Sequence, residues 1–504
     1  SSDLLPVAAQ DTYESARLLG SDLNGTARYV GMGGAMDALG ADLSTISSNP
    51  AGIGMFRKST ASVSFGTVTQ EDAADFAGGK ATRMSFDQLG FVYSCNLGNS
   101  FVNFGFNYHK SRNFGYILSA ADRLVGASQN KLSFAKAKNG LLYDGTDENG
   151  VPNVDQPFAS CNQLDDIYTR NLLFDTSDNT WYFDEASAYT LDRNHKGYIG
   201  SYDFNLSGNV NDRFYWGVTF GLKDVNYKHY GEYAEKLDGF NILVSDDRQI
   251  KGHGFDVTAG VIVRPIEESA FRFGLSVSTP TLYDLNTENS TTVNIDGHNV
   301  SSHESLDYKL NTPWQFGLSL GHTIGQNLAL GAGFEYADYS SLDSRYGTGS
   351  YYDWWTDTYS KDSESDEIMN RHTEQTLKGV CTFKLGAEYK PVPELAVRLG
   401  YNYVSPMYNE DGFKDGTLQS DGSYFASATD YTNWKATNRI TCGLGWQVGQ
   451  LNLAVAYQYS MQKGRFSPFM NYQDSDYADW DNICNEVKVE NKRHQLLFTL
   501  GYTF

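Results

Sequence analysis

The chain has 504 residues, with 39 Lys and Arg against 61 Asp and Glu, so its formal net charge is −22. This acidity excludes nucleic acid as the expected partner, because phosphate backbones are bound by basic surfaces. Tyr (34), Phe (29) and Gly (49) are abundant and Pro (11) is scarce, which favours strands joined by tight turns. The mean hydropathy is −0.45 and no apolar run approaches the roughly 18 residues of a membrane helix, which excludes a helical membrane protein but not a membrane barrel.

Residues 10–57 contain no strand pattern. From Gly25 to Gly54 most residues are small, and one short helix is expected around residues 35–39. Small side chains permit close packing against a surrounding wall. A barrel of more than about 8 strands is not filled by its own side chains. Residues 1–57 are therefore predicted to form a plug, or hatch, inside a barrel made by residues 58–504.

The rest of the chain alternates large apolar residues with small or polar ones, which is the period of a strand. In the last segment Leu496, Phe498 and Leu500 share one face, whereas Thr499 and Gly501 lie on the other. About 14 such strands are predicted, each of roughly 10 residues, the length of a tilted bilayer crossing. They are residues 59–68, 85–96, 100–111, 197–208, 214–226, 254–264, 271–280, 308–320, 328–338, 381–390, 395–404, 440–446, 451–460 and 495–504.

The connections between these strands alternate in length. Short turns such as residues 97–99 and 449–450 alternate with long polar stretches. The long stretches are predicted to be loops at 69–83, 112–196, 227–252, 281–307, 340–375, 405–437 and 463–489. Short periplasmic turns and long extracellular loops are typical of outer-membrane barrels. The predicted fold is therefore an all-β transmembrane antiparallel barrel, located in the outer membrane of a Gram-negative cell.

Five charged residues fall on the small and polar face of the predicted strands, which suits a wet lumen. They are Arg272, Glu335, Lys384, Glu388 and Arg398. One interpretation is that these charges pair with one another inside the barrel. The other is that they handle a ligand, since a carboxylate head group needs a cation near it. Arg272, Lys384 and Arg398 are the candidate carboxylate-binding residues.

The segment before the first strand ends in Ser48-Asn49-Pro50-Ala51-Gly52. This motif, together with the Gly-rich residues 25–54, the strand count and the terminal Phe504, resembles the FadL-type long-chain fatty acid transporters of Gram-negative outer membranes. The resemblance extends over nearly the whole chain and is specific only around residues 25–54. The loop at 112–196 is longer than the family pattern leads one to expect.

The resemblance implies passive uptake of long-chain fatty acids or other hydrophobic small molecules. In that family a ligand is captured among extracellular loops, enters a lumen pocket, and leaves through an opening in the wall where the third strand kinks inward. Carried over to this chain, Asn49, Pro50 and Ala51 are the hatch motif that gates the movement. The third strand would be residues 101–111, with Gly105 as the kink of a lateral gate, because Gly tolerates unusual backbone geometry.

No catalytic residues, metal site or cofactor are predicted. Residues 317–321 match the G-x-S-x-G pattern, but they lie inside an alternating strand, whereas a nucleophile elbow needs a following helix. The nine His do not cluster at metal-ligand spacing. Cys161 and Cys484 fall in predicted outer loops, where a disulfide between them is an open possibility.

Three alternatives compete with the transporter hypothesis. One is a FadL-related outer-membrane scaffold that binds or shuttles secreted proteins at its extracellular loops. Another is an active, TonB-dependent receptor, although the segment before the first strand is too short for the large plug of that class. The third is a secreted all-β glycosidase, which solubility without detergent would support. Outer-membrane lipid and a hydrophobic small molecule are the expected partners of the preferred hypothesis.

Overall fold

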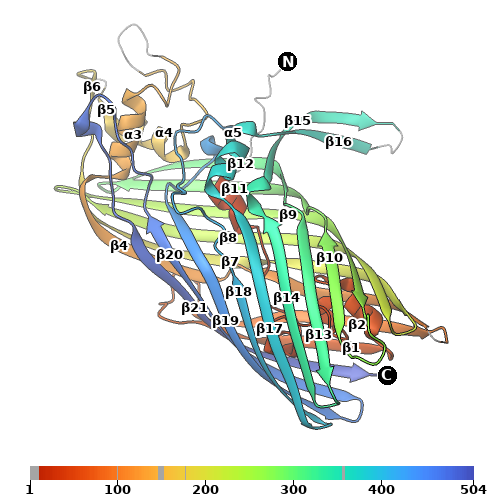
Figure 1. Cartoon of the computed structure of the whole chain (residues 1–504). Helices are drawn as coiled ribbons and strands as arrows, with labels where there is room; N and C mark the ends of the chain where they lie inside the picture. The colour runs from red at the N-terminus through yellow and green to blue at the C-terminus, as the bar shows by residue number, and fades with distance from the viewer. Residues whose placement is uncertain (1–10, 99, 146–151, 176, 355–357) are drawn as a thin grey trace.

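In the computed structural model, antiparallel strands close into a tilted barrel, with helices and loops gathered at one end (Figure 1). The structure describes residues 11–98, 100–145, 152–175, 177–354 and 358–504. Within these residues the wall has 14 strands, as predicted, and several of them are interrupted and carry two labels. The wall closes where β1 pairs with β21, from Thr60 opposite Thr503 to Gln70 opposite Arg493.

The first six wall strands are β1 (Thr60–Gln70), β2 (Thr82–Asn96), β3 (Ser100–Asn113) continued by β4 (Tyr116–Ala127), β7 (Ala186–Val210), β8 (Phe214–Lys236) and β9 (Asn241–Val263). The next four are β10 (Arg272–Ser278) with β11 (Leu282–Ile295), β12 (His298–Asn311) with β13 (Gln315–Ile324), β14 (Leu328–Asp338) with β15 (Asp343–Asp353), and β16 (Thr358–Ser365) with β17 (Gly379–Val392). The last four are β18 (Leu395–Val404), β19 (Tyr431–Val448), β20 (Leu451–Ser467) and β21 (Val487–Thr503).

Each wall strand exposes large apolar side chains on its outer face. One from each strand, in wall order, gives Phe65, Phe91, Phe104, Phe204, Phe220, Phe255, Leu275, Leu318, Leu330, Leu385, Leu399, Leu444, Leu453 and Phe498. An apolar surface that runs round the whole barrel far exceeds what a soluble protein leaves in water. The wall therefore crosses a lipid bilayer at this height, and we call this surface the apolar band.

Several strands are much longer than predicted. β7, β8 and β9 have 25, 23 and 23 residues, and the predicted loops at 227–252 and 281–307 are instead ladders of β8 with β9 and of β11 with β12. The outer row of β8 shows why the prediction failed. It changes from Phe220 and Leu222 to Asp224, Asn226 and Lys228, so above the bilayer the outer face is polar and the apolar residues of the strand lie on the inner face.

The outer face of the β11–β12 hairpin is polar and bonded across its strands. The Ser290 hydroxyl lies 2.8 Å from Nδ1 of His303, and the hydroxyls of Thr292 and Ser301 are also 2.8 Å apart. Hydrogen-bonded cross-strand pairs of this kind suit a sheet face in contact with water or sugars. This hairpin belongs to the extracellular part of the wall.

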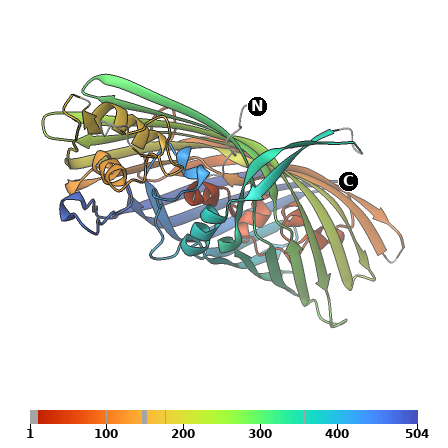
Figure 2. The same cartoon turned by 90° about the horizontal axis from the view of Figure 1, so that it is seen from above.

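Helices and loops cover the extracellular mouth of the barrel (Figure 2). They comprise α3 (Gln129–Lys138), α4 (Gln163–Tyr168), the π-turn η3 (Thr169–Leu173), the two-residue strands β5 (Phe174–Asp175) and β6 (Thr180–Trp181), η4 (Tyr339–Ser341), α5 (Glu367–Thr376), α6 (Asp421–Tyr424) and η5 (Ala478–Trp480). Phe134 of α3 packs its ring 4.7 Å from Phe183 and 5.7 Å from Trp480. No helix among the described residues is long and apolar enough to cross a membrane.

The two loop cysteines are not bridged. Cys161 and Cys484 are both free thiols and pack in separate apolar clusters of the extracellular cover. Burial raises the pKa of each thiol to about 12. The possible disulfide between them is therefore absent, because apolar packing has placed the two thiols in different parts of the cover.

Residues 11–57 lie inside the barrel, and residues 1–10 of the predicted plug are outside the described range. We call residues 11–57 the N-terminal segment, coloured red in Figure 1. It contains α1 (Thr12–Arg17), α2 (Ala27–Gly31) and the short 3-10 helices η1 (Leu43–Ile46) and η2 (Pro50–Met55). In place of the single helix expected at 35–39, turns occupy those residues.

Glycines of the wall allow the N-terminal segment to approach closely. A Cβ on Gly331 of β14 would overlap the carbonyl oxygen of Ala35, and one on Gly217 of β8 would overlap the carbonyl of Pro50. Small residues are therefore needed both in the N-terminal segment and on the lumen side of the wall strands. In the periplasmic half of the lumen, backbone packs directly against backbone.

Candidate functional site

The predicted hatch motif lies at the start of η2, against β7, β8 and β9. The Asn49 side chain accepts a hydrogen bond from the Ala51 amide at 3.2 Å and so caps the helix. Its Nδ2 donates to the carbonyls of Val261 at 3.5 Å and Leu275 at 3.4 Å in the wall. Pro50 occupies the first turn, where its missing N–H is no loss. The motif thus joins the N-terminal segment to the wall.

The three candidate carboxylate-binding residues all contact the N-terminal segment or a wall carboxylate. Arg272 donates to the carbonyl of Leu39 at 2.9 Å. Lys384 contacts Asp37 at 3.2 Å and also the carboxylate of Glu335.

Arg398 donates to Glu388 at 2.7 Å, and Arg28 of the N-terminal segment donates to the same carboxylate at 3.0 Å. Lys384 and Arg398 therefore pair with carboxylates inside the lumen, whereas Arg272 binds a backbone carbonyl of the N-terminal segment. A ligand role for Arg272, Lys384 or Arg398 stays a prediction.

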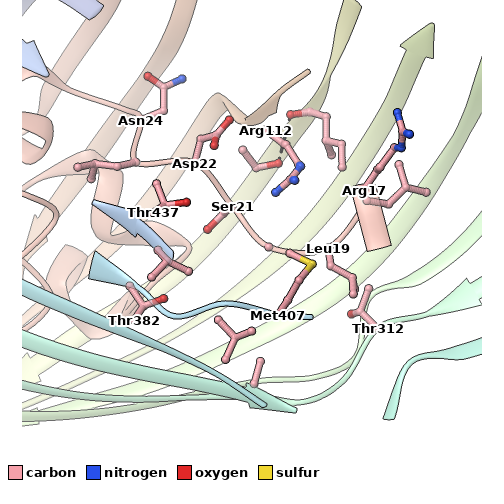
Figure 3. A pocket seen from close by; sticks show the side chains of 18 of the residues that line it. Arg17, Leu19, Ser21, Asp22, Asn24, Arg112, Thr312, Thr382, Met407 and Thr437 are labelled. Atoms are coloured by element: carbon pink, nitrogen blue, oxygen red, sulfur yellow. Dashed lines mark hydrogen bonds between the residues drawn. The ribbon is translucent and has the colours of Figure 1, made fainter. Parts of the chain in front are cut away.

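Above this packed region lies a cavity of about 340 Å³ (Figure 3). Its lining comes from α1, from the turn that follows α1, and from lumen-facing residues of the wall. One part is apolar and aromatic, with Leu19, Phe114, Met407 and Trp434. In Figure 3 Leu19 and Met407 lie together, whereas Asp22 and Arg112 lie close to each other on another side. The cavity therefore offers both an apolar and a charged surface.

Positive charge predominates in the lining, in contrast to the acidic chain as a whole. Seven lining residues are Lys or Arg and four are Asp or Glu. The cations are Arg17, Arg112, Lys223, Lys384, Lys435, Arg439 and Arg493, and the acids are Asp22, Asp203, Asp256 and Glu335. In a protein of net charge −22 this excess of cations gives the cavity a local charge opposite to that of the whole chain.

Three arginines of the lining act on one carboxylate. Arg439 Nη2 lies 3.6 Å from Oδ1 of Asp22, and its Nη1 donates to Asn402 at 2.7 Å. The charges of Arg493 and Arg112 also act on Asp22. The guanidinium of Arg112 lies 3.5 Å from where a Cβ on Gly20 would stand, so it reaches the same turn. We call Arg112, Arg439 and Arg493 the arginine cluster.

The roof of the cavity is α1, which is held by charges from the wall. Arg248 of β9 lies 2.8 Å from the Glu14 carboxylate. Arg17 donates to the Tyr227 hydroxyl at 2.7 Å. At the start of the helix the Thr12 hydroxyl lies 2.9 Å from Nδ1 of His372 in α5. The N-terminal segment is thus anchored both above and below the cavity.

The wall is interrupted beside the cavity. β2 and β3 pair from Gln88 opposite His109 toward the periplasmic end. Both strands continue in the extracellular direction without pairing with each other. Among the described residues, 82–87 have no ladder partner in β3 or β4. The β3–β7 register shifts between Lys110 and Arg112, and β3 ends at Asn113. We call this interruption, bounded by residues 82–87 and 110–115, the wall gap.

The interruption does not lie at Gly105. Gly105 is paired with Val92 on one side and Asn205 on the other, in regular register. Its missing side chain instead leaves room for the N-terminal segment, since a Cβ there would lie 3.4 Å from Ile46. Among the described residues the β3 ladder breaks instead at residues 110–115, where its register shifts and the strand ends, and a lateral gate at Gly105 stays a prediction.

Residues 20–24 of the N-terminal segment occupy the inner side of the wall gap. The Asp22 amide donates to the carbonyl of Ser111 at 2.7 Å, and the Asn113 amide donates to Oδ2 of Asp22 at 2.8 Å. Asn24 donates to the Asp87 carboxylate and to the Lys110 carbonyl, each at 3.1 Å. These contacts satisfy backbone groups that a neighbouring strand would otherwise satisfy.

Sequence reasoning missed the arginine cluster. Arg112 lies in a predicted loop, and Arg493 lies just before the predicted last strand. Arg493 shares the lumen-facing parity of Gln495 and Leu497, so extending the alternation upstream by two residues would have found it. Arg112 follows the bulge, where parity is lost, and no signal in the sequence indicates its position.

A closed antiparallel barrel with an apolar outer face, a lumen filled by its own N-terminal segment and an internal cavity defines the class of plugged membrane channel barrels. A structure search finds a FadL homologue of Pseudomonas aeruginosa at a TM-score of 0.50 and 12% identity, covering 96% of this chain and 99% of that one. The chain has the FadL-type outer-membrane transporter fold. Its barrel and apolar band place it in the outer membrane of a Gram-negative cell.

Two further solved structures are similar at lower scores. The toluene transporter TbuX of Ralstonia pickettii has a TM-score of 0.49 and 12% identity, covering 96% of this chain and 99% of that one. The toluene transporter TodX of Pseudomonas putida has a TM-score of 0.47 and 10% identity, covering 96% and 98%. No protein family model and no curated protein matches the sequence.

Proposed function

We propose that the protein is a channel for passive uptake of amphiphilic small molecules, long-chain fatty acids among them, across the outer membrane. A ligand is captured at the extracellular loops, enters the lumen cavity, and leaves sideways through the wall gap. The N-terminal segment gates this route. Its hatch motif, Asn49-Pro50-Ala51, stays attached to the wall, whereas residues 20–24 withdraw from the gap.

The observation that carries this proposal is the position of the cavity. Its apolar surface around Leu19 and Met407, its arginine cluster and the wall gap are adjacent. On the outer face of β2 beside the gap, Met84 is 85% exposed and Phe86 is 44% exposed, so an exit there leads onto an apolar surface. A tail that passes directly from protein to lipid avoids water at about 0.8 kcal/mol per CH2.

Binding of dodecanoate and of dodecanol to purified protein in a nonionic detergent tests the proposal. We expect both to bind, dodecanoate more tightly. Arg439→Gln is expected to weaken dodecanoate binding roughly tenfold, the equivalent of one charge-assisted hydrogen bond, and to leave dodecanol binding unchanged. Titration calorimetry measures both.

The matched control is Arg213→Gln, which changes an Arg that is 48% exposed in a periplasmic turn. It is expected to change neither affinity. Failure of the wild-type protein to bind either amphiphile would contradict the proposal.

The alternative is a scaffold for secreted proteins at the extracellular face. The observation that favours it is the hairpin of β15 and β16, which projects away from the barrel beside the covering helices (Figure 1). Native mass spectrometry of protein purified from membranes distinguishes the two functions. A co-purified amphiphile supports the channel, and a stoichiometric protein partner with an empty lumen supports the scaffold.

A further inference from the structure

Asp22 contacts both the edge of the wall gap and the arginine cluster. Through its amide and Oδ2 it is bonded to Ser111 and Asn113 at the broken edge of β3. Through Oδ1 it faces Arg439, and the charges of Arg112 and Arg493 act on the same carboxylate. One residue therefore both bonds to the edge of the wall gap and serves as the anion of the arginine cluster.

The charges in this cluster do not balance. Among the described residues, neither Arg112 nor Arg493 makes a side-chain hydrogen bond or an ion pair within 4.0 Å, so Asp22 is the acid that the three guanidinium groups share. The side chains of Asp22 and Arg439 are 21% and 8% exposed. Three guanidinium groups that share one carboxylate, with Arg439 nearly buried and Arg112 and Arg493 half-buried, favour a further anion.

Residues 21–24 are also bounded by two flexible positions. Gly20 has φ +75° and Gly25 has φ +138°, conformations that favour glycine. A change of backbone direction at these two residues moves the turn between them, and it also moves Leu23, which is buried in one apolar cluster with Tyr29 of α2. Hinges of this kind absorb the dihedral changes of gating segments.

We propose that Asp22 is an internal competitor for the head group of an anionic substrate, and that the exchange opens the wall gap. The substrate carboxylate binds the arginine cluster, Asp22 leaves it, and residues 21–24 then lose the position that keeps them bonded to Ser111 and Asn113. This inference rests on the proposed function. It adds that the charged head group of the substrate, and not its alkyl tail alone, releases residues 21–24 from the wall gap.

Hydrogen exchange measured by mass spectrometry on the full wild-type chain tests the release. Saturating dodecanoate is expected to accelerate amide exchange at least threefold in peptides that contain residues 20–24 and 110–115, because the Asp22 and Asn113 amides lose their acceptors. Saturating dodecanol is expected to bind without this acceleration. Slower exchange with dodecanoate, or equal acceleration by both, would overturn the proposal.

The variant Asp22→Asn tests the competition. Its side-chain oxygen still accepts from Asn113, but its charge is removed, so dodecanoate is expected to bind roughly tenfold more tightly than to wild type, with dodecanol unchanged. Asp256→Asn is the matched control, since Asp256 lines the same cavity but pairs with Lys223 at 3.2 Å. The increase in dodecanoate affinity in Asp256→Asn is expected to be much smaller than in Asp22→Asn.

The outcomes separate the two proposals. Equal gains in Asp22→Asn and Asp256→Asn would assign the effect to the general field of the cavity and overturn the role of Asp22. Binding of dodecanoate with no gain in Asp22→Asn would also overturn it while leaving the channel function intact. If neither amphiphile binds wild type or either variant, the proposed function itself fails.

Discussion

The two halves of the lumen hold the same N-terminal segment in different ways. In the periplasmic half, backbone packs on wall glycines such as Gly331, and Glu388 joins Arg28 of the segment to Arg398 of the wall. Beside the cavity, residues 20–24 meet the wall through hydrogen bonds and the ion pair of Asp22 with Arg439, and the nearby cations outnumber the acids. The periplasmic half of the segment is fixed by close packing and buried ion pairs. The half beside the cavity is held by polar contacts that water or a ligand can replace.

Breaking the ion pairs of the packed half is expected to have the largest effect. Glu388→Gln leaves Arg28 and Arg398 without their shared carboxylate, and removing one partner of a buried pair is strongly destabilising. Because the Arg28 side chain is 30% exposed, we expect the free energy of unfolding to fall by about 3 kcal/mol, the low end of what such a loss costs. The midpoint of urea unfolding in detergent micelles measures it.

The control for this change is Glu267→Gln. Glu267 pairs with Arg213 at 3.4 Å in a periplasmic turn, and its side chain is 76% exposed. Exposed pairs contribute little, so a loss below about 0.5 kcal/mol is expected. Equal losses in the two variants would show that the packed half is not anchored by its charges.

The next effect comes from the close backbone packing. Gly331→Ala places a methyl group against the carbonyl of Ala35 and is expected to cost about 2 kcal/mol through overpacking. It should also raise ion conductance in planar bilayers as the segment is displaced. In Gly501→Ala, whose new Cβ would lie 3.5 Å from the nearest side-chain atom, neither quantity is expected to change.

The smallest effect is expected beside the cavity. Asn24→Ala removes the hydrogen bonds to Asp87 and to the Lys110 carbonyl, each 3.1 Å long, at a cost of about 1 kcal/mol. Hydrogen exchange of residues 20–24 should become faster while that of residues 27–55 stays unchanged. Faster exchange along the whole segment would contradict the division into two halves.

The sequence was sufficient to predict the membrane-crossing parts of the wall strands. Where one face meets lipid and the other the lumen, alternation is strict, so all 14 wall strands were predicted close to their observed places. Above the bilayer the outer face turns polar while buried apolar residues such as Val225, Val244 and Val293 continue on the inner face, and the upper parts of β8 and β9, the whole of β11 and most of β12 were therefore predicted as loops. The lumen charges were identified together with the wall partners Glu335 and Glu388, but Arg28 and Asp37 were not, because they belong to a segment without periodicity.

The wall gap could not be predicted from local sequence. It arises from a bulge at Lys110–Arg112 and from the way distant residues such as Asn24 replace a missing strand partner. Gly105 drew attention because glycine is permissive, yet its role is to let Ile46 approach. Glycine in a barrel strand marks a close neighbour at least as readily as a bend.

The height of the wall has a consequence for how a substrate arrives. At about 3.3 Å per residue, the 25 residues of β7 span far more than the apolar band, even when tilted. The excess length, with the bonded polar face of β11 and β12, stands among the saccharide chains that cover the outer leaflet of a Gram-negative cell. Under the proposed function, a molecule with a long alkyl tail would thus meet the protein within that hydrated layer, which otherwise retards its diffusion toward the bilayer.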